Sequence, residues 1–174
     1  MKRIFAFILC LIIALSFVAC SPKEEAKPAV REQYSALSCQ DFVNLVKEQG
    51  YTTVENADKS LVQFERAFSV ADEKGFTLSF FELKDIETSY AFYNKLLQSH
   101  EVYLSEFSEH MRYNNYGYYM LKDKSSTIYF AFVDNTFIFS ISKAQKEEDV
   151  EVVRNTLVEM IKHIDYPIGD FPAA

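Results

Sequence analysis

Residues 127–142 read TIYFAFVDNTFIFSIS, and they contain the clearest indication of the fold. It is built almost entirely from aromatic, β-branched and small residues, which is typical of β-strands. Asp134-Asn135 divides it in two and has the form of a two-residue hairpin connection. The first strand is apolar on both faces, with Tyr129, Ala131 and Val133 on one face and Ile128, Phe130 and Phe132 on the other. Such a strand is expected at the centre of a sheet that is covered on both sides.

On the C-terminal side of this hairpin, the sequence predicts a final helix over residues 147–163. Its apolar residues recur at the helical spacing of three and four, which gives the helix one buried face. They are Val150, Val153, Leu157, Met160, Ile161 and Ile164. The tail 167–174 contains Pro167 and Pro172 and is expected to be irregular.

On the N-terminal side, a second hairpin is predicted around the turn 72–75. Phe76, Leu78 and Phe80 alternate with polar residues, whereas Phe81 has the opposite parity and indicates that the second sheet face is also partly covered. A central helix is predicted to begin at Ile86, with Asp85 as its N-cap.

A first helix is predicted to begin after Ser38, which forms a capping pair with Asp41. Gly50 stands where this helix would end. Its apolar stripe consists of Cys39, Phe42, Val43 and Val46. The element order is therefore α-ββ-α-βββ-α, which predicts an α+β domain at 38–166 with three helices on an antiparallel sheet of about five strands.

The first twenty residues differ in composition from the rest. Lys2 and Arg3 precede a run without charge at 4–18, which is short for a transmembrane helix and has the order of parts of an export signal. The run ends in Phe17-Val18-Ala19-Cys20, which resembles the lipobox of bacterial lipoproteins, although Phe17 stands where leucine is usual.

The resemblance implies that residues 1–19 are removed and that the sulfur of Cys20 carries acyl chains at the mature N-terminus. Residues 20–37 are then expected to form the lipidated cysteine and a flexible tether, since Pro22, Pro28 and mixed charges oppose regular structure. Two alternatives are an ordinary signal peptide cut at a nearby site and an uncleaved membrane anchor.

The charge of the chain bears on its partners, and its cysteine content bears on its chemistry. Loss of Lys2 and Arg3 reduces the 18 basic residues to 16 against 25 acidic ones, so the net charge moves from −7 to −9. An acidic surface disfavours a nucleic-acid partner.

After removal of the signal and lipidation of Cys20, Cys39 remains as a lone thiol, which is expected to be buried in the first helix. The alternatives are that it acts as a nucleophile or forms an intermolecular bridge.

No cofactor or metal site is predicted. His100, His110 and His163 lack the spacing that places two ligands on one helix face, and His110 with Glu106 and Glu109 is interpreted as solvated charge. The four glycines stand apart, so the sequence contains neither a glycine-rich phosphate loop nor a nucleophile elbow.

One segment is a candidate binding site for a protein, peptide or glycan. Tyrosines are favoured at recognition surfaces because they combine a flat apolar ring with a hydroxyl. The candidate residues are Tyr113, Asn114, Asn115, Tyr116, Tyr118 and Tyr119. The alternative is an ordinary hairpin whose tyrosines are half-buried at the rim of the sheet.

Together these features predict a lipid-anchored protein that faces outside the cytoplasm, on the cell membrane or the outer membrane. Its domain is expected to be a binding module that performs no chemistry of its own. Two alternatives are an envelope-acting hydrolase and an accessory subunit or chaperone of an export or transport complex.

Overall fold

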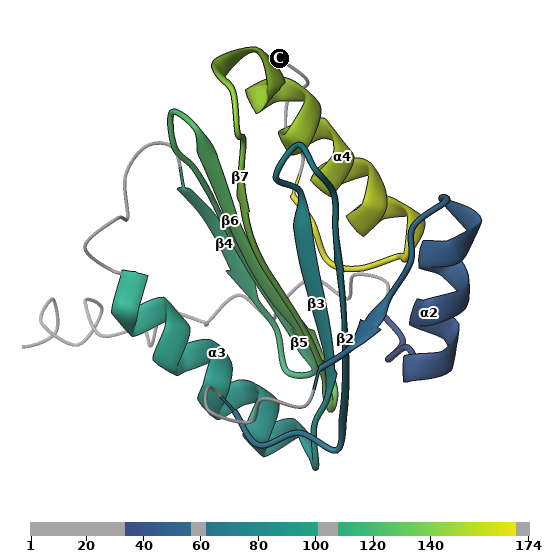
Figure 1. The fold of residues 1–174 in the computed structure, drawn as a ribbon. Coiled ribbons are helices and arrows are strands. Elements are labelled where there is room, and N and C mark those ends of the chain that lie inside the picture. Colours follow the sequence, from purple (N-terminus) through teal and green to yellow (C-terminus); the bar gives the residue numbers. More distant parts are fainter. Residues whose placement is uncertain (1–33, 57–61, 101–107, 170–174) are drawn as a thin grey trace, which may run out of the picture. The chain divides into compact units, whose positions relative to one another are not determined.

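A computed structural model describes residues 34–56, 62–100 and 108–169, all within the unit Glu32–Ala174. They form one antiparallel sheet of seven strands in the order β1-β2-β3-β7-β6-β5-β4 (Figure 1). The strands are β1 Val54–Glu55, β2 Arg66–Ala71, β3 Thr77–Glu82, β4 Ser108–Arg112, β5 Tyr116–Lys122, β6 Ser126–Val133 and β7 Thr136–Lys143.

Helices cover both faces of this sheet. The helices are α2 Cys39–Glu48, α3 Ile86–His100 and α4 Val150–His163, the last preceded by a 3₁₀ turn, η2 Glu147–Asp149. On one face α2 packs over β2 and β3 while α4 packs over β6 and β7; α3 packs over β6 and β7 on the opposite face (Figure 1). The described residues therefore form three layers.

For the described residues the α+β class, the antiparallel sheet and the three helices are confirmed, but the predicted number of about five strands is too low. The described residues form seven, and the two short strands at the sheet edges were missed. β1 has only two residues, Val54 and Glu55, and is too short to show the alternation of a strand. The sequence of β4, SEHMR, is mainly polar, as edge strands commonly are because charge discourages pairing with other chains.

Local capping explains where α2 begins and ends. The Oγ of Ser38 accepts a hydrogen bond from the backbone N–H of Asp41 at 3.1 Å, as predicted. At the other end, Gly50 has φ +83°, and its N–H donates to the carbonyl of Lys47 at 2.9 Å. The helix thus ends in the left-handed conformation that glycine adopts without strain.

The turn between β2 and β3 is organised by one carboxylate. The Oδ1 of Asp72 accepts hydrogen bonds from the N–H groups of Lys74, Gly75 and Phe76, at 3.0, 2.9 and 2.9 Å. Gly75 has φ +108°, and its carbonyl accepts from the N–H of Lys143 at 3.0 Å. The predicted turn is confirmed, and it also ties the start of β3 to the end of β7.

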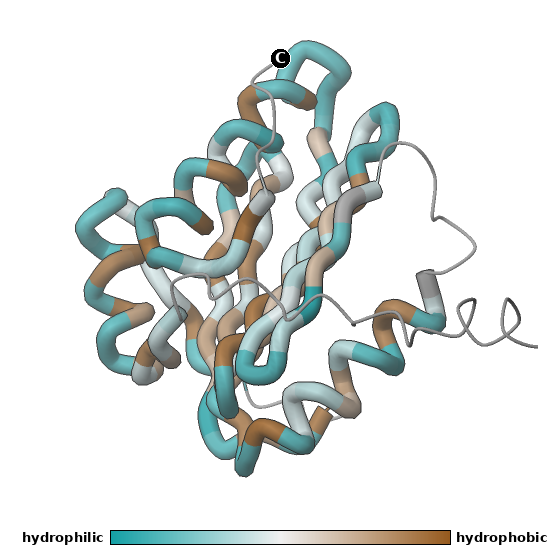
Figure 2. Tube along the Cα trace, turned by 180° about the vertical axis from the view of Figure 1, so that it is seen from behind, coloured by the Kyte–Doolittle hydropathy of each residue, from teal (hydrophilic) through white to brown (hydrophobic). Residues whose placement is uncertain are grey.

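The β6–β7 hairpin forms the centre of the sheet. Its turn is Asp134-Asn135, with Asp134 at φ +50°, and β6 lies between β7 and β5. Apolar side chains fill both sides of the sheet. The α2/α4 core includes Phe42, Phe76, Phe80, Tyr129, Leu157 and Ile161, and the α3 core includes Phe81, Tyr93, Phe130, Phe132 and Phe137. Figure 2 shows the matching alternation of hydrophilic and hydrophobic residues along the helices.

The described part of the chain reaches beyond the predicted domain at both ends. Tyr34 and Leu37, assigned to the tether from the sequence, pack against the α2/α4 core. At the other end Pro167 is buried and Ile168 packs against the same core. Within the described ranges, none of the helices has the length and apolar character needed to cross a membrane.

Candidate functional site

The tyrosine segment lies at the turn from β4 to β5. The N–H of Tyr113 donates to the carbonyl of Tyr116 at 2.7 Å and closes the turn. The carbonyl of Asn115 accepts from the N–H of Asp134 at 2.7 Å. This turn is therefore fixed to the β6–β7 turn beside it.

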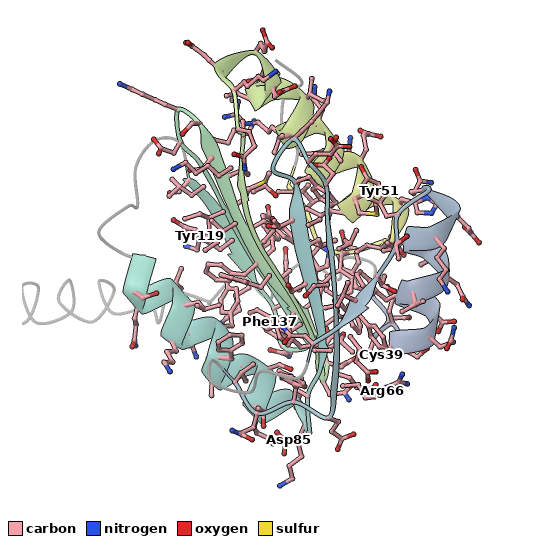
Figure 3. All side chains as sticks on the ribbon, in the orientation of Figure 1. Cys39, Tyr51, Arg66, Asp85, Tyr119 and Phe137 are labelled. Atoms are coloured by element: carbon pink, nitrogen blue, oxygen red, sulfur yellow. The ribbon has the colours of Figure 1, made fainter. Side chains whose placement is uncertain are left out.

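Three of the predicted site tyrosines are part of the core. Tyr116 and Tyr118 are 4% and 2% exposed in the α2/α4 core, while Tyr119 is fully buried on the opposite face, where its ring stacks on Phe130 with centroids 4.8 Å apart. Figure 3 shows Tyr119 and Phe137 on the α3 side of the sheet and Cys39 on the α2 side. In this conformation the three rings are enclosed, and that of Tyr116 is covered by Tyr34 and Tyr113.

The neighbours of β5 account for this burial. Pairing with β4 over Ser108–Arg112 and with β6 on the other side makes β5 an interior strand, and the α2/α4 and α3 cores cover its two faces. The guanidinium of Arg112 also lies 4.9 Å from the ring centroid of Tyr90, which links β4 to α3. The sequence prediction missed β4, so the binding-site interpretation exposed these tyrosines and its alternative left them half-buried at the rim of the sheet.

The rest of the segment remains accessible. Asn114 is exposed, and Tyr113 and Asn115 are half-buried. The ring of Tyr113 lies over that of Tyr116, with centroids 4.6 Å apart, and the ring of Tyr34 meets Tyr116 edge-on at 4.9 Å and 68°. The structure thus brings together Tyr34, Tyr113 and Tyr116, and sequence reasoning missed Tyr34 because it fell within the predicted tether.

Buried phenols hold the C-terminal segment. The hydroxyl of Tyr129 donates to the carbonyl of Pro167 at 2.6 Å, and that of Tyr166 hydrogen-bonds the hydroxyl of Thr136. Burial raises the pKa of both tyrosines well above the ordinary value, and for Tyr129 the neighbouring phenols Tyr166 and Tyr34 add to the rise. These hydroxyls have a structural role and remain protonated.

This burial predicts alkaline sensitivity. Below about pH 10, tyrosines are protonated in both folded and unfolded chains. Above it the unfolded chain loses protons that folded Tyr129 and Tyr166 retain, so the free energy of unfolding falls by up to about 1.4 kcal/mol per pH unit for each phenol. Urea unfolding followed by circular dichroism from pH 8 to 11 measures this slope. A Tyr129→Phe, Tyr166→Phe double variant should show a shallower slope, and a parent curve that stays flat to pH 11 would contradict the assignment.

Cys39 is buried, as predicted, with 1% of its surface exposed. Burial, followed by the hydrogen bond and negative charge of Glu82, raises the pKa of its thiol to about 12. Nucleophilic cysteines require a lowered pKa. The thiol therefore packs as an apolar group, which favours the structural interpretation over the nucleophile.

The histidines that were considered as metal ligands lie apart in the fold. His110 is exposed on β4, and the Nε2 of His163 lies 3.6 Å from a carboxylate oxygen of Glu48, at the adjoining ends of α4 and α2. The described residues contain no group of three histidine, cysteine or acidic side chains able to hold a metal ion. Cys20 and the other signal residues lie outside the described residues, as does Glu106.

Comparisons with known proteins give the chain no family. Neither a family model nor a curated protein matches it. One similar solved structure is a GTP-binding regulator from Thermotoga maritima, with 14% identity and a TM-score of 0.45 over 74% of this chain and 84% of that one. A superposition of this quality carries no inference about function.

Proposed function

We propose that this chain is a lipoprotein, held by acyl chains on Cys20 to a membrane face outside the cytoplasm, and that its domain is a binding module. The observation that carries the proposal is the uncharged run 4–18, which follows Lys2 and Arg3 and ends in Phe17-Val18-Ala19-Cys20. Two or more acyl chains on one residue give stable attachment, whereas one chain binds only marginally.

Two properties of the sequence fit this assignment. With a net charge of −9 after processing, the protein would gain no attraction to anionic lipid, so the proposed attachment depends on the acyl chains. Residues 21–33 form the link between Cys20 and Tyr34, the first described residue, and their proline and charged content suits an extended spacer.

A binding role is supported by how the domain uses its polar side chains. The phenols of Tyr93, Tyr129 and Tyr166 are committed to internal hydrogen bonds, and burial keeps the Cys39 thiol protonated. Groups engaged in this way stabilise a rigid scaffold. A partner would therefore bind at the surface of the domain, at its turns and strand edges.

Replacement of Cys20 by serine tests the anchor. The parent protein is expected in the membrane fraction and Cys20→Ser in the soluble fraction, because serine has no sulfur to accept the acyl group. Cys39→Ser is the matched control, since it removes a buried thiol from the domain and should leave the protein with the membrane. Membrane-bound Cys20→Ser protein would mean that something other than this cysteine holds the chain.

A further inference from the structure

The sheet face at β4 and β5 is covered by a segment of irregular chain on the α2/α4 side. Residues 34–37, here called the strap, form neither helix nor strand and lead directly into α2. Tyr34 places its ring edge on Tyr116, and both Tyr34 and Leu37 pack against the α2/α4 core. On this face α2 covers β2 and β3 and α4 covers β6 and β7, so the strap covers tyrosines that lie beside the helices.

Tyr113 and Tyr116 lie beneath the strap in a hydrogen-bonded turn, and the strap itself is only partly enclosed. Tyr113 and Tyr116 belong to a turn closed by its own hydrogen bond and fastened to the β6–β7 turn through Asn115. By contrast, Tyr34 and Leu37 are half-buried, and Ser35 and Ala36 between them are exposed. The site is therefore preformed on one side and covered by a segment that solvent reaches on the other.

We propose that Tyr113 and Tyr116 form a docking site for an extended peptide that presents an aromatic side chain, and that the strap occupies this site until such a peptide replaces it. This inference deepens the proposed binding function and rests on it. The geometry of Tyr34 defines the chemistry: an aromatic ring meets the Tyr116 ring at 68°, from a backbone that is neither helical nor paired in the sheet. Edge-to-face contact is a preferred arrangement of aromatic rings.

Release of the strap would expose an aromatic ring next to a polar side chain. The ring of Tyr116 loses its Tyr34 cover while Tyr113 stays over it at 4.6 Å, with exposed Asn114 alongside to offer an amide. Tyrosine and asparagine are both enriched in antibody recognition loops, where tyrosine supplies contact area and asparagine supplies adaptable hydrogen bonds. Because the strap continues directly from the tether, a bound peptide would also lengthen the link between the domain and its anchor.

The test uses a fluorescent peptide with the sequence of residues 31–38, REQYSALS, added to the full chain in detergent micelles. In the parent, the attached strap competes at an effective concentration in the millimolar range, so the added peptide should bind weakly. Tyr34→Ala removes that competition and should tighten binding at least about tenfold. The double variant Tyr34→Ala, Tyr113→Ala should lose the gain, and a peptide with alanine in place of the tyrosine should not bind.

Equal affinity for the parent and Tyr34→Ala, or no binding to either, overturns the proposal. If circular dichroism shows that Tyr34→Ala is unfolded, Leu37→Ala loosens the same strap and replaces it in the comparison. Fluorescence anisotropy reports binding without reference to lipidation. A negative result here therefore removes the docking site, while the fractionation of Cys20→Ser separately decides the anchor.

Discussion

Gly75→Ala is expected to lower the free energy of unfolding by about 3–5 kcal/mol. A Cβ at this position would lie 1.9 Å from the carbonyl oxygen of Lys143 and 2.8 Å from its carbonyl carbon, far inside van der Waals contact. Both atoms belong to backbone at the end of β7, so no side chain can turn aside to make room. The φ of +108° adds strain for any residue with a side chain.

Gly50→Ala is the control for this substitution. Gly50 also has a positive φ, +83°, but a Cβ built there would meet nothing within 4 Å. The expected loss is about 1–2 kcal/mol, from backbone strain alone. Urea unfolding of both variants by circular dichroism separates the clash from the strain. Equal losses would show that the contact between Gly75 and Lys143 does not constrain the fold.

Phe130→Ala is expected to cost about 3–5 kcal/mol, since it removes a fully buried ring from the centre of the α3 core. That ring stacks on Tyr119 at 4.8 Å and meets Tyr93 edge-on at 5.4 Å, so the cavity would lie between two further aromatic side chains. The same urea titration measures the loss.

Ile141→Ala provides the comparison for Phe130→Ala. Ile141 lies on neighbouring β7 but is 48% exposed, and its truncation should cost less than about 1 kcal/mol. Similar losses for the two variants would contradict the assignment of Phe130 to a sealed core. If the Phe130→Ala protein does not fold at all, its loss of stability is larger than expected and still agrees with a place in the core.

Sequence periodicity predicted most of the fold because the chain alternates clearly. The two apolar faces of β6 indicated a central strand covered on both sides, and α2 and α3 cover opposite faces of the sheet that contains it. The caps at Ser38 and Asp85 were predicted from side-chain chemistry; the Oδ1 of Asp85 accepts from the N–H of Thr88 at 2.8 Å. Bonds to Thr88 lower the pKa of Asp85, in keeping with a carboxylate cap.

The candidate site was harder to predict because its surroundings depend on long-range packing. Tyr116, Tyr118 and Tyr119 look like a surface motif in sequence, but they lie on an interior strand and pack into the cores on its two faces. Since β4 is mainly polar, its sequence lacks the apolar alternation that would predict a strand. Tyr34 sits in a segment whose composition predicts a tether, and its contact with Tyr116 joins residues 82 positions apart. Local patterns carry no information on such a pair.

Mass spectrometry of the mature N-terminus tests whether Cys20 is lipidated. Protein purified from membranes of cells that produce the full chain is digested, and the N-terminal peptide is examined for its first residue and mass. We expect a peptide that begins at Cys20 and carries diacylglycerol on its sulfur. A peptide that begins at another residue, or an unmodified Cys20, would contradict it.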